Sequence, residues 1–346
     1  MIILIVLISL SILILVHELG HFLSAKIFGV RVHEFGFGFP PKILGKKIGE
    51  TTYSLNLLPF GGFVKIHGED GEETQDKQSF ANQSVIRRSI IVLAGVFMNI
   101  LLGWLILSAV FAIGSPRHLA ISGISEESPA ATANLKSGDL ILEAKFNEHI
   151  LKDPIPVNEF INLVKSAEKN TITLKIKRGE AISEISLRGR SNPPPGQGSL
   201  GLSLLEIGFA KEPIFKSLAK GTAATLETLK LVTLGFFNFF SKLFVTPQII
   251  ETVTGPIGIF TLATQAGSFG IVYLFELIAF ISLNLAVLNL IPFPALDGGR
   301  FLFLLIEKIK GGPVPRKFQL IVNAVGFVAL IILMVIVTVK DITKIL

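Results

Sequence analysis

Five residues near the N-terminus, His17-Glu18-Leu19-Gly20-His21, have the types and spacing of a metal-dependent hydrolytic site. Positions four apart lie on one face of a helix, so the two imidazoles can bind one tetrahedral zinc ion. Glu18 then lies beside the metal, where its carboxylate can take a proton from a bound water molecule. The alternative is a polar cluster that caps an apolar helix at a membrane interface. Ionisable groups in such a helix need partners, which favours the metal site.

A second segment can supply the third protein ligand that catalytic zinc requires. The chain has no cysteine, so this ligand must come from another polar side chain. Residues 289–299 read Asn-Leu-Ile-Pro-Phe-Pro-Ala-Leu-Asp-Gly-Gly. Pro292 and Pro294 cannot continue a regular helix, and the two glycines are expected to release the backbone after Asp297. We therefore predict that Asp297 lies on an irregular turn at membrane depth and completes the site, rather than on an exposed loop.

The composition is that of a membrane protein with a smaller soluble insert. Of the 346 residues, 50% are hydrophobic and 17% are charged, and the mean hydropathy is +0.64, whereas soluble domains carry about 25% charged residues. Four apolar stretches are long enough to cross a membrane core of about 30 Å. They lie at 2–24, 89–113, 271–291 and 318–339. The first lacks the basic start and the cleavage site of a signal peptide, so we expect a retained transmembrane helix.

The segments between these stretches differ in character. Short apolar alternation bounded by glycines in 25–88 predicts strands and a hairpin, with a surface loop as the alternative. Residues 116–190 have the pattern of a compact α+β domain with a helix at 156–168. Residues 214–245 are apolar but rich in lysine, which favours an amphipathic interfacial helix over a fifth span. The predicted parts are a first membrane half at 1–115, a soluble domain at 116–190, a Pro- and Gly-rich linker at 191–213, an interfacial region at 214–255 and a second membrane half at 256–346.

The basic residues predict how the chain is oriented. The loop at 25–88 contains nine lysines and arginines, and the short loop near 300–317 contains five. Four spans place both loops on one face, and the positive-inside tendency makes that face cytoplasmic. The soluble domain and both termini then lie outside. Because the net charge of +6 is concentrated beside apolar runs, we expect no nucleic-acid partner.

The two motifs and the soluble insert between them resemble the site-2 protease family, and in particular the bacterial regulator of sigma-E protease group. The resemblance covers nearly the whole chain. It implies a zinc metalloendopeptidase in which His17, His21 and Asp297 bind zinc and Glu18 activates water. It also implies a polytopic α-helical membrane protein with four transmembrane helices, a membrane-associated β-hairpin that pairs with unwound substrate, and one inserted α+β PDZ-like domain that filters substrates. Such proteins lie in the bacterial inner membrane, with the active site toward the cytoplasm.

The resemblance further implies substrates and the residues that bind them. Substrates would be single-span membrane proteins such as anti-sigma factors, or remnant signal peptides, and an upstream site-1 protease would act on the same substrate. The family's asparagine that contacts substrate backbone falls on Asn289, with Asn284 one turn earlier. The family's Gly-Pro-x-x-Asn appears as Gly-Val-Phe-Met-Asn over 95–99. Its last residue, Asn99, could make a helix contact or orient substrate, and both interpretations stay open.

Two other functions use the same residues. A metal transporter would want ionisable residues along further spans, and the interiors of the second and fourth spans contain none. A catalytically silent scaffold would be favoured by loss of the motif's glutamate, and Glu18 is present. The remaining histidines are expected at the surface or in loops; they are His33, His67, His118 and His149.

Overall fold

The computed structural model describes residues 2–69, 76–167, 170–179, 181–243, 245–246, 249 and 253–345. The chain forms two compact units. The helical unit comprises Met1–Ser108, Ala219–Thr264 and Phe275–Leu346, and the sheet unit comprises Ala109–Leu218 and Gln265–Leu274. Parts of the predicted interfacial region, at 244, 247–248 and 250–252, lie outside the described residues.

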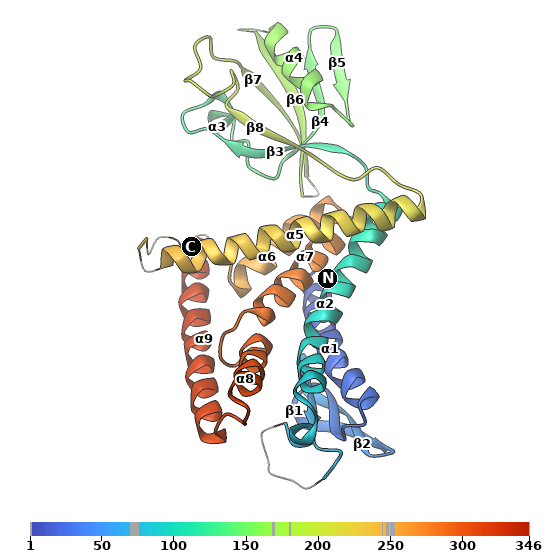
Figure 1. Cartoon of the computed structure of the whole chain (residues 1–346). Helices are drawn as coiled ribbons and strands as arrows, with labels where there is room; N and C mark the ends of the chain where they lie inside the picture. The colour runs from blue at the N-terminus through green and yellow to red at the C-terminus, as the bar shows by residue number, and fades with distance from the viewer. Residues whose placement is uncertain are drawn as a thin grey trace. The chain divides into compact units, whose positions relative to one another are not determined.

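Among the described residues, four helices are long and apolar enough to cross a membrane, as the sequence predicts. They are α1 (Ile2–Ile27), α2 (Val85–Ile113), α7 (Ile271–Leu290) and α9 (Arg316–Ile345) (Figure 1). Their apolar residues face all directions, as in helices surrounded by lipid or by other spans. The chain is therefore a multi-pass membrane protein that also contains β-sheet regions.

Three other helices accompany the spans. They are α5 (Ile214–Leu243), α6 (Pro256–Phe269) and α8 (Asp297–Lys310). None of the three is among the candidate spans of the described chain. The prediction of a loop near 300–317 is wrong over most of that range, because α8 extends to Lys310. Phe301 and Leu304 pack against the core, the basic Lys308 and Lys310 suit the end of a helix, and Gly311 ends it in a left-handed conformation.

Strands β1 (Val32–Ile48) and β2 (Thr51–Ile66) form the predicted hairpin, which folds back on itself. The first half of β1 pairs with 62–66 on one side and with 52–55 on the other. The second half of β1, residues 42–48, pairs with the start of β2 and is exposed. Residues 42–48 thus form the outer edge of the hairpin and offer unpaired backbone groups.

An ion pair fixes the outer edge to the first half of β1. Lys42 Nζ lies 2.7 Å from a carboxylate oxygen of Glu34. Burial alone would raise the pKa of the Glu34 carboxyl, but the hydrogen bond from Lys42 holds that pKa below its ordinary value. Glu34 therefore stays ionised and keeps the edge in register near neutral pH.

The sheet unit is built on an antiparallel sheet with strand order β7-β6-β4-β3-β8. Its first strands are β3 (His118–Ile124), β4 (Leu140–Phe146) and β5 (His149–Lys152), and β5 pairs with β4. The short helix α3 (Pro129–Thr132) follows β3, and α4 (Val157–Ala167) matches the predicted helix at 156–168. The remaining strands are β6 (Thr171–Arg178), β7 (Ala181–Arg188) and β8 (Leu202–Ile207).

Alternation of side chains builds the core of this unit. Ile172, Leu174 and Ile176 on β6 are at most 2% exposed, and they pack with Phe160 of α4. Strand β8 lies inside the segment predicted to be a linker, yet it pairs with β3 over its whole length. The folded sheet therefore continues beyond the predicted domain boundary at residue 190.

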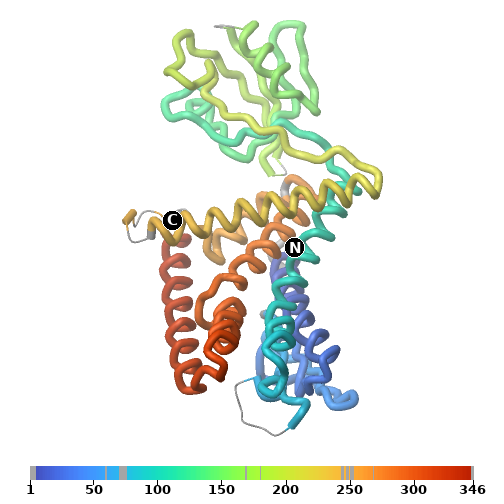
Figure 2. Tube along the Cα trace, in the orientation of Figure 1, coloured from blue at the N-terminus to red at the C-terminus, as the bar shows by residue number. Residues whose placement is uncertain are grey.

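In the helical unit, one apolar cluster joins α1, α2, the hairpin and α8. Its members include Phe22 and Ala25 of α1, Ile91 of α2, Ile66 of β2 and Leu304 of α8. Figure 2 shows α1 and the first half of α2 beside the hairpin. The cluster holds together the elements that carry the predicted metal ligands.

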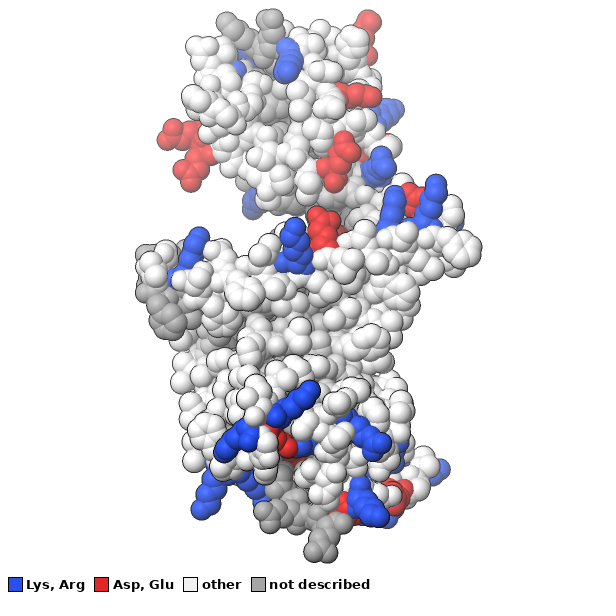
Figure 3. Space-filling view, viewed as in Figure 1, with Lys and Arg blue, Asp and Glu red and all other residues white. Residues whose placement is uncertain are grey.

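Ion pairs reinforce this packing around α8. Arg88 of α2 donates two hydrogen bonds to the carboxylate of Glu307, one of them 3.0 Å long. Arg300 pairs with Glu69, which follows β2. On the face shown in Figure 3, Lys and Arg gather around the end of the helical unit that carries the hairpin and α8, and the helix flanks above them carry no charged side chains.

Candidate metal centre

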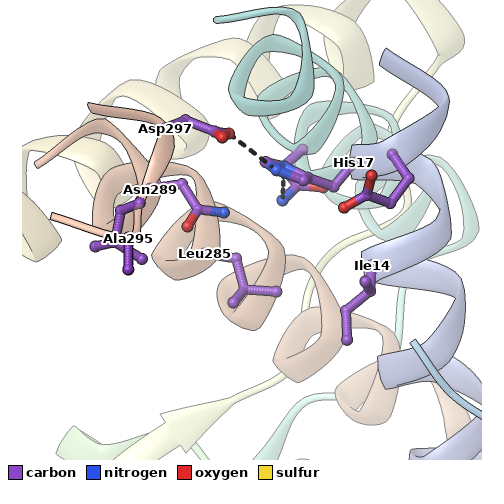
Figure 4. Close-up of a pocket in the computed structure, with 9 residues that line it drawn as sticks. Ile14, His17, Leu285, Asn289, Ala295 and Asp297 are labelled. Carbon is purple, nitrogen blue, oxygen red and sulfur yellow. Dashed lines mark hydrogen bonds and ion pairs between the residues drawn. The ribbon is translucent and has the colours of Figure 1, made fainter. Parts of the chain in front are cut away.

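The two histidines and the aspartate singled out by the sequence lie together in the helical unit. Figure 4 shows the side chains of His17 and Asp297 pointing toward each other. His17 and His21 lie on α1, and each is 8% exposed. Asp297 is the first residue of α8. The Nε2 atom of His17 lies 3.2 Å from that of His21 and 3.0 Å from Asp297 Oδ2. His21 Nε2 lies 3.4 Å from the same oxygen.

These three atoms are spaced as ligands of one zinc ion. Nitrogen and oxygen ligands lie about 2.0–2.1 Å from zinc, so two ligands of a tetrahedral site lie about 3.3 Å apart. Asp297 Oδ2 is buried and has no hydrogen-bond partner among the described residues. Three lone pairs therefore converge on one point, an arrangement that a divalent cation stabilises. Two imidazoles and one carboxylate leave a fourth position for water, as catalytic zinc requires.

Helix α2 supports the two imidazoles from behind. His21 Nδ1 donates a 2.8 Å hydrogen bond to the carbonyl oxygen of Ile91. His17 Nδ1 lies 3.3 Å from the side-chain amide of Asn99. Gly95 lies between them, and a Cβ there would be 2.5 Å from His21 Nε2 and 2.7 Å from His17 Cε1. The histidine pair therefore needs a residue without a side chain at position 95.

The turn that presents Asp297 follows from its prolines and from α9. Helix α7 ends at Leu290, and the two prolines keep the chain from resuming it at once. Ala295 has a positive φ of 73°, which is strained for a residue with a Cβ. Its backbone N–H donates a 3.1 Å hydrogen bond to Asn323 Oδ1 of α9. Asn323 therefore stabilises an unfavourable turn two residues before Asp297.

The sequence suggested that the two glycines after Asp297 release the backbone. This prediction is wrong, because both glycines lie inside α8. Gly298 and Gly299 are buried in the first turn of α8. A Cβ on Gly298 would collide with the carbonyls of Leu290 and Ile291, and one on Gly299 would collide with the carbonyl of Phe293. Their role is to let α8 begin tightly against the preceding turn.

A cavity of about 250 Å³ opens beside His17 and Asp297. Glu18 lines it, as do Asn289 and Asn99. Asn284 does not, because its side-chain amide donates a 2.8 Å hydrogen bond to Phe280 O within α7. The structure therefore brings together six of the seven predicted site residues and leaves Asn284 aside.

The other four histidines lie elsewhere. His33 Nε2 is 3.2 Å from His67 Nδ1 beside the hairpin, and His67 Nε2 is 3.3 Å from Asp76. In the sheet unit, His118 Nδ1 is 2.7 Å from Asp153 Oδ2, and His149 is exposed on β5. Within the described chain, none of them joins a group of three metal-binding side chains.

Two supporting residues escaped the sequence interpretation. Ile91 acts through its backbone carbonyl, which leaves no mark in the sequence. Asn323 is a polar residue within an apolar span, and such residues need a partner inside the protein. That signal could have pointed to it.

The sequence matches known metalloproteases along most of its length. The profile of peptidase family M50 matches residues 5–333. A protein of Clostridium perfringens described as a candidate zinc metalloprotease is 36% identical over 336 residues, covering 97% of each chain. The regulator of sigma-W protease RasP of Bacillus subtilis is 27% identical over 414 aligned positions, covering 96% of each chain. The chloroplastic membrane metalloprotease ARASP of Arabidopsis thaliana is 29% identical, covering 96% of this chain and 76% of that protein.

Proposed function

Because this chain belongs to peptidase family M50 and is an intramembrane zinc metalloprotease, we propose that His17, His21 and Asp297 hold its zinc and that Glu18 is its general base. The observation that carries this assignment is the convergence of three ligand atoms beside a cavity that Glu18 also lines. Bound zinc polarises a carbonyl and lowers the pKa of a water molecule. Glu18 takes the proton of that water and delivers it to the leaving amine.

The geometry of an α-helix supports cleavage of an unwound segment. A helix engages its backbone carbonyls in internal hydrogen bonds, so a helical substrate must unwind before its carbonyl reaches the centre. The Asn289 amide lines the cavity and can then bind the exposed backbone.

The hairpin offers a way to hold the unwound chain. An extended peptide can add to the outer edge at 42–48 through backbone hydrogen bonds. An apolar hollow of about 510 Å³ lies between this edge and α1, lined among others by Leu15, Phe37 and Leu44. Side chains of an apolar membrane segment fit such a hollow.

The substrates we propose are single-span membrane proteins, including anti-sigma factors, and signal peptides left in the membrane. The similarity to a regulator of sigma-W protease supports the first class. The clustering of Lys and Arg near the hairpin and α8 supports a cytoplasmic position for the metal centre in a bacterial inner membrane. An upstream protease would first remove the bulk of the substrate outside the membrane.

The sheet unit then lies outside the membrane as a PDZ-like filter. Its strand β8 is an edge strand. Glu206 on β8 accepts a 2.8 Å hydrogen bond from the N–H of Val157, at the start of α4. An unpaired edge beside a helix can take up a peptide end by strand addition.

The assignment is tested with three variants of the full-length protein. Glu18→Gln should retain one zinc per chain and lose cleavage of a transmembrane reporter, because it removes the base and no ligand. His17→Ala and Asp297→Asn should lose or weaken zinc binding. Metal analysis of the purified proteins is read beside reporter cleavage. Near-normal cleavage by Glu18→Gln, or a full zinc content in Asp297→Asn, contradicts the proposal.

A further inference from the structure

One face of α2 is built to support the histidine pair. Ile91, Gly95 and Asn99 are spaced four apart, so they lie in a row along the helix. The first provides a carbonyl oxygen to His21 Nδ1, and the second provides space for both rings. Asn99 is fully buried and meets His17 Nδ1. The sequence left open whether Asn99 makes a helix contact or orients substrate.

The atom assignments at His17 decide what Asn99 can do. The Nε2 atoms of both histidines face each other and Asp297, so each ring carries its proton on Nδ1 when Nε2 binds a metal. His21 Nδ1–H has an acceptor in Ile91 O. His17 Nδ1–H needs one too, and the side-chain amide of Asn99 lies 3.3 Å from this nitrogen.

The two ends of that amide are assigned from hydrogen bonding and can be exchanged. With Nδ2 toward His17, two N–H groups would face each other, and Asn99 Oδ1 is buried without a partner among the described residues. With Oδ1 toward His17, the oxygen accepts the Nδ1 proton. The second orientation removes the opposed N–H groups and gives Oδ1 a donor.

We propose that Asn99 is a positioning residue whose Oδ1 accepts the Nδ1 proton of His17, and thereby fixes the ring for zinc binding. The inference rests on the proposed metal site. Partners of this kind orient metal-binding histidines and increase their basicity, and their loss typically weakens metal binding about 10- to 100-fold. Asn99 itself would touch neither the metal nor the scissile bond.

The test compares zinc affinity in the purified full-length protein, measured by competition with a zinc chelator. Asn99→Leu has a similar volume and no acceptor, so its zinc affinity should fall about 10- to 100-fold. Asn99→Asp keeps an acceptor oxygen and should bind zinc at least as tightly as wild type. If Asn99→Leu does not fold, the smaller Asn99→Ala removes the same acceptor.

Ser282 provides the matched control. Its hydroxyl donates a 2.8 Å hydrogen bond to the backbone carbonyl of Asn99, and it is as deeply buried as Asn99. Ser282→Ala removes this hydrogen bond between α7 and α2 and leaves the side-chain amide of Asn99 in place. The zinc affinity of Ser282→Ala should therefore match that of wild type.

Three outcomes would overturn the inference. The first is unchanged zinc affinity in Asn99→Leu together with lost cleavage, which would make Asn99 a substrate contact. The second is an equal loss of affinity in Asn99→Leu and Asn99→Asp, which would make it a structural helix contact. The third is a full zinc content in His17→Ala, which would contradict the proposed metal site itself. Failure of the metal site is thereby distinguished from failure of the inference about Asn99 alone.

Discussion

At the scale of single residues, the proposed metal centre requires a residue without a side chain at position 95 as well as the three ligands. The rings of His17 and His21 occupy the space where a Cβ on Gly95 would lie. A methyl group there would press on His21 Nε2, the atom that faces His17 and Asp297 in the proposed metal centre. The geometry of the site thus depends on how closely α1 approaches α2.

Gly95→Ala should therefore weaken zinc binding by about tenfold or more, a loss within the range seen when the surroundings of a metal ligand are disturbed. The helix itself should not suffer, because alanine favours a helix more than glycine does. Zinc affinity by chelator competition, read beside helical content by circular dichroism, measures the effect.

Gly103→Ala is the matched control for this prediction. It lies on the same helix, but its added Cβ would meet the side chain of Leu283 and no imidazole. Its zinc affinity should stay at the wild-type value. Equal affinities in wild type and Gly95→Ala would show that the rings are not confined by α2.

The sequence alone predicts those site residues whose chemistry resides in their side chains. The spacing of His17, Glu18 and His21 indicates one metal and one base. The prolines before Asp297 indicate a turn that can carry a third ligand. A backbone carbonyl such as that of Ile91 and an empty space such as that at Gly95 depend on how two distant helices pack, so no local pattern reveals them.

At the scale of elements, α8 positions Asp297, the proposed third ligand, and an ion pair outside the proposed ligand set fixes α8. Arg88 of α2 and Glu307 of α8 form a two-point hydrogen-bonded pair, with side chains 12% and 16% exposed. Paired contacts of this kind between arginine and carboxylate are directional. The pair holds α8 against the same helix that supports the histidines.

Arg88→Leu should lower both the stability of the protein and its zinc affinity, because it leaves the Glu307 carboxylate partly buried and unpaired. Breaking a fully buried pair in this way costs about 3–5 kcal/mol, and this partly exposed pair should cost less. The exchanged pair, Arg88→Glu with Glu307→Arg, should recover part of the zinc affinity. Thermal unfolding and zinc titration measure the two effects.

Arg87→Leu removes the same charge one residue earlier. Arg87 is exposed, and its hydrogen bond goes to Gln83, four residues before it. It should leave zinc affinity unchanged. If Arg87→Leu and Arg88→Leu weaken zinc binding equally, overall charge and not the link between α2 and α8 is responsible.

The elements themselves were predictable where a local signal was strong. Long apolar runs predicted α1, α2, α7 and α9. Helix α8 was missed because its basic residues suggested a loop, although Phe301 and Leu304 already showed a helical apolar spacing. Strand β8 was missed because it follows a Pro- and Gly-rich stretch and depends on pairing with β3, about 80 positions away in sequence.

At the scale of the whole molecule, the residues proposed to bind the metal and the strands of the larger sheet belong to different units. His17, His21 and Asp297 all belong to the helical unit, and so do the supporting residues of α2 and α9. The sheet unit has its own apolar core, built from β3, β4, β6 and α4. Each unit therefore has the internal contacts expected of a separately stable fold.

Removing the sheet should consequently leave the metal centre intact and relax the choice of substrate. We predict that a chain in which residues 117–207 are replaced by a short Gly-Ser linker binds one zinc, because none of the ligands or their supports lies in that segment. The replaced segment must extend to residue 207, since stopping at 190 would leave β8 without its partner β3. Substrates with a bulky domain outside the membrane should then be cut, whereas wild type should cut only trimmed ones.

Metal analysis and cleavage of a matched pair of long and short reporters measure this. The shortened chain that also carries Glu18→Gln gives the background level of cleavage. Loss of zinc from the shortened chain would show that the sheet is needed to build the centre, and unchanged discrimination between the two reporters would show that it does not filter substrates.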